Sequence, residues 1–328
     1  MKKFFLVLLA LSIAGLAFAE VEASISGGLQ MDMGVLIPTG DYADASEWYW
    51  DTLGNGGTYI QANAEGENIS AWVMARADGA WMGVVKANLG SFDLSVGHNR
   101  LPVKMWSSFN LWGDNHFAFG ASSTARTPFI QADFAGVFLG LADGGAMNGW
   151  KAKEESWSPY FYFGYNFKPE DGALNAGFAF VGSHLSAHIT GTTDSAFTFM
   201  GKAYATFDLD PLAFGLNVAL YNKTSGFFSI SNNPIAWMNN DMVLEALLDF
   251  GVGLEPCSIG LGLGLVVGLG KENEGGGGLG FKAGLSADFD LGGTGLVFCP
   301  GLALTSFNFG HDIKSSQIDI GISFMYNF

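Results

Sequence analysis

The chain has 328 residues, and 31 acidic side chains against 15 lysines and arginines give it a formal net charge of −16. A chain this acidic is a poor candidate for nucleic-acid binding, which needs basic groups to neutralise phosphates. Its mean hydropathy is positive, at +0.26. Beyond the N-terminus, however, no apolar run reaches the ~20 residues of a membrane-spanning helix without glycine or polar interruption.

The first residues have the pattern of a secretory signal peptide. Two lysines precede an apolar run over residues 4–16, which is followed by the small-x-small cleavage site Ala17-Phe18-Ala19. An uncleaved helix is less favoured, because the run is shorter than the ~20 residues that span a bilayer. We therefore expect residues 1–19 to be a cleaved signal peptide. Residues 20–328 should form one domain, since no repeat or linker is visible.

After this leader, large apolar residues recur at every second position in segment after segment. A period of two indicates β-strands with one apolar face and one polar or small-residue face. A hydrophobic exported chain without spanning helices can satisfy its backbone in lipid by closing such strands into a barrel. We predict an all-β, transmembrane, antiparallel up-and-down barrel of about sixteen strands, with fourteen to eighteen possible. The expected strands cover residues 21–35, 57–65, 69–77, 81–89, 91–98, 116–125, 129–141, 158–167, 173–185, 195–207, 212–221, 241–250, 257–269, 278–290, 294–304 and 315–328.

The expected connections alternate between long and short. Long loops follow odd-numbered strands, at residues 36–56, 99–115, 142–157 and 222–240. Other connections are mostly short turns, and a short turn at residues 78–79 breaks the pattern. Short periplasmic turns and long external loops are typical of barrels whose termini both lie in the periplasm. The first strand follows the cleavage site closely, which leaves no room for an N-terminal plug. The segment 240–250 also fits helical spacing, so a helix is the alternative there.

Charged residues on the polar faces are the candidate pore lining. Arg76 and Lys86 should face the lumen, because the other face of each strand is apolar, and Arg100 and Arg126 lie near them in the sequence. A basic patch facing acidic side chains across a pore would create a transverse field that favours small polar solutes. Alternatively, these charges are only kept away from lipid, where each would cost ~2–4 kcal/mol. The acidic candidates come from distant strands: Asp32, Glu245, Asp249, Asp288 and Asp319.

Other chemistry has little support in this sequence. No spaced nucleophile motif supports an enzyme, and His184 and His188 lack the glutamate of a zinc-binding HExxH motif. We expect no metal and no cofactor. Cys257 and Cys299 could form a disulfide in an exported chain. They fall two expected strands apart on strands that run the same way, so free thiols are the expectation. The apolar loop 99–115 could either narrow the channel or form an aromatic cap.

The last strand carries the most specific pattern. Large apolar side chains occupy every second position from Ile318 to the end, closing on Phe324, Tyr326 and Phe328. This ending resembles the terminal strand of bacterial outer-membrane β-barrels of the porin type, whose assembly machinery reads such a strand. The resemblance implies an outer-membrane location, contact with its lipid, and passive diffusion of small hydrophilic solutes or ions. It also implies a possible homotrimer. The alternatives are a hydrophobic-substrate transporter and a surface barrel whose loops act in adhesion.

Overall fold

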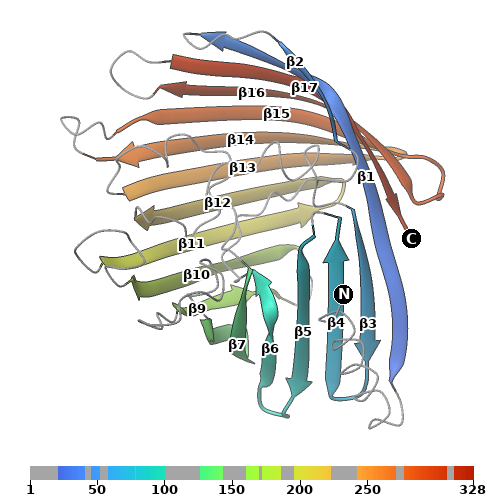
Figure 1. The fold of residues 1–328 in the computed structure, drawn as a ribbon, viewed down its shortest axis with the longest axis vertical. Helices are drawn as coiled ribbons and strands as arrows, with labels where there is room; N and C mark the ends of the chain where they lie inside the picture. Colours follow the sequence, from blue (N-terminus) through green and yellow to red (C-terminus); the bar gives the residue numbers. More distant parts are fainter. Residues whose placement is uncertain are drawn as a thin grey trace.

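The computed structural model describes residues 21–40, 46–51, 58–77, 79–100, 126–142, 160–169, 172–185, 196–222, 242–270, 277–308 and 314–328. These residues form seventeen strands, which Figure 1 labels along the chain. The strands are β1 (Glu22–Gly40), β2 (Glu47–Asp51), β3 (Tyr59–Glu65), β4 (Ile69–Arg76), β5 (Trp81–Asn88), β6 (Asp93–Arg100), β7 (Arg126–Phe134), β8 (Val137–Ala142), β9 (Tyr160–Phe167), β10 (Leu174–Leu185), β11 (Ala196–Leu209), β12 (Leu212–Asn222), β13 (Met242–Leu254), β14 (Cys257–Leu269), β15 (Leu279–Asp290), β16 (Leu296–Asn308) and β17 (Lys314–Asn327). Among the described residues, no helix is long and apolar enough to cross a membrane.

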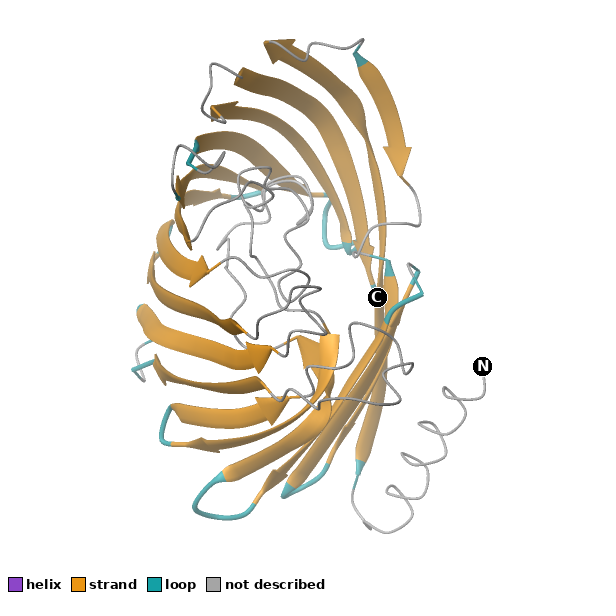
Figure 2. Ribbon diagram, turned by 60° about the vertical axis from the view of Figure 1, so that its left-hand side comes forward, coloured by secondary structure: helices purple, strands orange, loops and turns teal. Residues whose placement is uncertain are grey.

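The sheet closes on itself. All strand pairs are antiparallel, and β1 pairs with β17 from Gly28 opposite Asn327 to Gly40 opposite Ser315. Next to this register, Gly27 and Phe328 exchange two backbone hydrogen bonds of 2.9 and 3.1 Å. The phenyl ring of Phe328 lies over Gly27, where a Cβ would have no room. Figure 2 shows the strands curving around an interior. Closure removes the free sheet edges that a barrel in lipid could not leave unpaired.

The seventeen strands fill sixteen wall positions, because β2 and β3 share one place beside β1. β1 pairs with β3 up to Gly28 opposite Tyr59, and with β2 from Asp32 opposite Asp51. Between the two stretches, Gln30 faces no strand partner on that side. Thr58 fills the place, since its hydroxyl accepts from the Gln30 N–H at 3.1 Å and donates to the Gln30 C=O at 3.3 Å. The predicted closed barrel of sixteen strands is therefore confirmed.

Alternation explains why these segments are strands. In β14, the isoleucine and leucines at odd positions are exposed on the outer side of the wall, whereas the glycines and Val266 at even positions are buried. Exposed large apolar residues recur at the outward positions of the other strands as well, among them Leu139, Phe163 and Leu302. The barrel therefore has an apolar outer face, as membrane barrels require.

Several local expectations were wrong. The segment 129–141 is not one strand but the hairpin of β7 and β8, which turns at Ala135 and Gly136. The expected loop 36–56 contains the end of β1 and all of β2, because the first hairpin is longer than its composition suggested. The expected strand 116–125 lies outside the described residues. The helix alternative for 240–250 is excluded over β13, which is a strand.

The two ends of the barrel differ as predicted. Turns at one end are short, such as the connections from β7 to β8, β11 to β12 and β13 to β14. The connections at the opposite end include the longest separations between strands, after β6, β8 and β12. The short link from β4 to β5 is at this second end and is the expected exception. The chain termini of the described barrel lie at the end with short turns, because β1 starts there and β17 finishes there.

Candidate functional site

The inner face of the barrel follows from the register. Cross-strand partners in a sheet project to the same side, so the side of Asp32 can be traced from strand to strand around the ring. It passes through Ser323 and Cys299 at the closing seam and returns through Asn63 and Ser24. We call this set of alternate residues the inner face. Polar, charged and glycine residues dominate it, whereas the other face carries the exposed leucines and phenylalanines.

The closing seam carries a hydrogen-bonded cluster on the inner face. The Gln30 side-chain amide donates to both Asp32 oxygens at 3.1 and 3.2 Å, and to the Ser323 Oγ at 3.3 Å. Tyr49 of β2 reaches across β1 and donates its hydroxyl hydrogen to Asp319 Oδ1 of β17, at 3.1 Å. Gly34 makes this crossing possible, since a Cβ there would lie 2.5 Å from the Tyr49 hydroxyl. The cluster links three wall positions across the seam.

A second group of charges lies on the inner face of β11, β12 and β13, and β13 is four strands from β17 around the ring. Glu245 and Asp249 of β13 are 1% and 0% exposed, and Lys202 of β11 is 5% exposed. Tyr221 donates to Glu245 Oε1 at 2.7 Å. The Lys202 Nζ lies 4.9 Å from the centroid of the Tyr204 ring, which is within the range of a cation–π contact. Burial of charge is costly unless it is paired or hydrogen-bonded, and these contacts supply part of that compensation.

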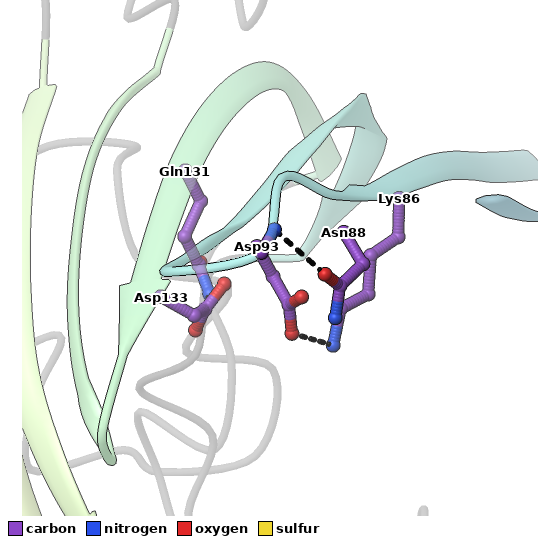
Figure 3. A network of polar contacts seen from close by, with 6 residues as sticks. Lys86, Asn88, Asp93, Gln131 and Asp133 are labelled. Carbon is purple, nitrogen blue, oxygen red and sulfur yellow. Dashed lines mark hydrogen bonds and ion pairs between the residues drawn. The ribbon is translucent and has the colours of Figure 1, made fainter. Parts of the chain in front are cut away.

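A third group lies near the short turns, on β5, β6 and β7 (Figure 3). The Lys86 Nζ lies 2.7 Å from Asp93 Oδ2, and the two side chains are 47% and 27% exposed. Asp133 is the cross-strand partner of Asp93. Gln131 donates to Asp133 Oδ1 at 2.8 Å. Two carboxylates and one ammonium group therefore share a small volume at this end of the inner face.

The predicted lining residues fall as follows. Arg76, Lys86 and all five acidic candidates occupy positions of the inner face; the five acids are Asp32, Glu245, Asp249, Asp288 and Asp319. Arg100 and Arg126 are partners of each other at the ends of β6 and β7. Both positions have the outward register, and the structure does not describe their side chains. The structure brings Asp32 and Asp319 to one seam but does not place Arg76 beside Lys86 as a single basic patch. Whether these residues set selectivity remains a prediction.

Sequence reasoning did not name several polar residues of the inner face as pore-lining residues. Lys202 and Lys282 lie on it, and alternation with their apolar neighbours was the available signal. Asp93 was missed as well, although it lies in a strand that was expected. Asp133 and Tyr49 were missed for another reason. Asp133 fell in a segment read as one strand, and Tyr49 in one read as a loop. The outward apolar residues occupy even positions at 130, 132 and 134 and odd positions at 137, 139 and 141. This change from even to odd marks the turn.

The two cysteines are not joined in a disulfide, as expected, and they lie on different faces of the wall. Cys299 belongs to the inner face and is fully buried, whereas Cys257 occupies an outward position at the start of β14. β14 and β16 run the same way with β15 between them, as expected. Within the described ranges, no group of three or more histidine, cysteine or acidic residues could hold a metal ion.

Comparison with known proteins identifies the fold. No protein-family model and no curated protein sequence matches the chain. The outer membrane channel DcaP of Acinetobacter baumannii superposes with a TM-score of 0.65 at 12% identity, covering 94% of this chain and 98% of that one. OpdO of Pseudomonas aeruginosa gives 0.56 at 10% identity, with 93% and 97% covered. OmpF of Salmonella typhi, in complex with daunomycin, gives 0.55 at 11% identity, again with 93% and 97% covered. The chain therefore has the closed, antiparallel β-barrel fold of the outer-membrane porins.

Proposed function

We propose that this protein is an outer-membrane channel for passive diffusion of small hydrophilic solutes and ions. The observation that carries the proposal is the division of one closed wall into an apolar outer face and a polar inner face. An apolar band around a barrel suits lipid, and polar side chains suit an aqueous interior. The likeness to the channel DcaP over nearly its whole length supports the same conclusion.

The charge of the inner face favours cations. Acidic side chains outnumber basic ones at its described positions. Among the inner residues that are at least partly exposed, the acids include Glu65, Asp93, Asp133 and Asp288, and the bases are Arg76 and Lys86. A passage lined by one sign of charge concentrates ions of the other sign. We therefore expect potassium to pass more readily than chloride.

Export and assembly belong to the same proposal. The leader 1–19 lies outside the described residues and would direct the chain across the inner membrane. The terminal strand, with Phe324, Tyr326 and Phe328 on the outward register, would engage the barrel assembly machinery before it pairs with β1. A homotrimer, which the resemblance of the terminal strand to those of porins implies, is also part of this proposal.

Two measurements on purified, refolded protein test the channel. Liposomes containing it should swell in isotonic small sugars, and planar bilayers under a potassium chloride gradient should show a reversal potential of cationic sign. Folding is checked by the heat-dependent gel mobility of a closed barrel. Folded protein that gives neither swelling nor conductance refutes the proposal. A tight barrel that instead takes up a hydrophobic substrate, or binds a surface, would point to the alternative functions.

A further inference from the structure

Solvent reaches the inner face of the barrel unevenly. On strands β8 to β17, the inner residues at mid-height are almost all buried. Tyr162 is 2% exposed, Ala219 is 1% exposed and Lys282 is 6% exposed. The inner glycines of β14 and β15 are buried as well. Charges on this arc, such as Glu245 and Asp319, are therefore held within the protein, with hydrogen bonds from Tyr221 and Tyr49.

Strands β3 to β6 present a different inner face. Tyr59, Gln61 and Asn63 follow one another along β3, and all three are partly exposed. Trp72 and Met74 are partly exposed on β4, and Lys86 is exposed on β5. Met82 and Ser95 are the buried inner residues that we find on this arc, at 9% and 8%. Partly exposed inner residues thus run from mid-height to the end with the short turns.

We propose that solutes pass along the inner face of β3 to β6, and that Lys86, Asp93 and Asp133 are the specificity-determining residues at its periplasmic end. The inference rests on the proposed channel function and adds its route. Ions are selected by charges that they approach through water. A charge buried behind other groups acts little on them, because its neighbours in the protein already compensate its loss of hydration. The buried acids Asp32, Glu245, Asp249 and Asp319 then stabilise the wall and do not select solutes.

The charges at the periplasmic end carry the selectivity because they are accessible. Lys86 neutralises one carboxylate, Asp93, through the 2.7 Å ion pair. Asp133, which is half-buried beside Asp93, keeps one oxygen beyond its single hydrogen bond from Gln131. Figure 3 shows Lys86, Asp93 and Asp133 projecting toward the same space. The group therefore carries one net negative charge that a passing cation can approach.

Two sets of variants test the route. The Asp133→Asn variant should lower the ratio of potassium to chloride permeability, and Lys86→Gln should raise it, each by about twofold or more, since one unit charge is removed at an accessible site. The matched controls Glu245→Gln and Asp249→Asn remove one charge each from the buried arc and should leave the ratio unchanged. In parallel, a charged thiol reagent should reduce conductance of a Gln61→Cys variant but not of Ala219→Cys. The unsubstituted protein, with its two native thiols, sets the background.

The outcomes separate the route from the channel itself. Protein that conducts but is blocked at position 219, blocked equally at both positions, or blocked at neither, overturns the route and leaves the channel function standing. A selectivity change in Glu245→Gln or Asp249→Asn as large as that in Asp133→Asn overturns it as well. Folded protein without conductance refutes the proposed function, and the route with it.

Discussion

Thr58 offers a sharp test of how the wall is closed. At the step between β2 and β3, the Gln30 N–H and C=O point to a place where no strand continues. The Thr58 hydroxyl satisfies both groups, and the side chain is only 8% exposed. The Thr58→Val substitution keeps the shape of the side chain and removes the hydroxyl. It would leave two main-chain groups without partners inside the wall.

The expected loss of stability in Thr58→Val is large for the removal of one hydroxyl group. An unsatisfied buried donor or acceptor costs about 1–3 kcal/mol, so two such groups give a loss of about 2–6 kcal/mol. The Thr58→Ser variant keeps the hydroxyl and loses one methyl group, which costs about 1 kcal/mol or less. The hydrogen bonds therefore predict a clear order of stability, with the native chain first, serine close behind and valine last.

The assay is equilibrium unfolding in urea, with the barrel in lipid vesicles and tryptophan fluorescence as the signal. Heat-dependent gel mobility gives an independent reading of the closed state. The reasoning is refuted if Thr58→Val unfolds at the same urea concentration as the native chain. It is also refuted if Thr58→Ser is destabilised as much as the valine variant, since packing and not the hydroxyl would then be responsible.

Three further outcomes are expected. Tyr49→Phe removes one hydrogen bond across the seam, and should lower the free energy of unfolding by about 1–2 kcal/mol in the same urea assay without changing conductance. Phe328→Ala uncovers Gly27, and should cost about 1–3 kcal/mol because the ring is only partly buried, with Phe328→Leu intermediate; equal stability of all three forms would contradict this packing role. Cys257 and Cys299 occupy opposite faces, so electrophoretic mobility under oxidising and reducing conditions should be identical.

The turn between β7 and β8 shows where local reasoning failed. Ala135 and Gly136 both have positive φ, at 48° and 85°, as a two-residue hairpin turn of type I′ requires. Alanine seldom adopts that conformation, so the dipeptide gave no clear turn signal. The pairing of β7 with β8 and of β8 with β9 outweighs this local preference. In the sequence, only the change of the apolar residues from even to odd positions across the turn indicated the hairpin.

The sequence by itself determined the architecture, because alternation is a local property. A residue such as Leu263 or Phe324 belongs to the outer face by its parity alone, and a long series of such strands can satisfy its backbone in lipid only as a closed ring. Only the tertiary structure decided the contacts between strands far apart in the chain. The Tyr49–Asp319 bond joins residues 270 positions apart and depends on closure. The Thr58 step and the exposed side of the interior depend likewise on strand register, although Thr58 and Gln30 are only 28 positions apart. The alternation along a strand determines on which face of the wall a side chain lies. It does not determine which side chain of another strand lies beside it.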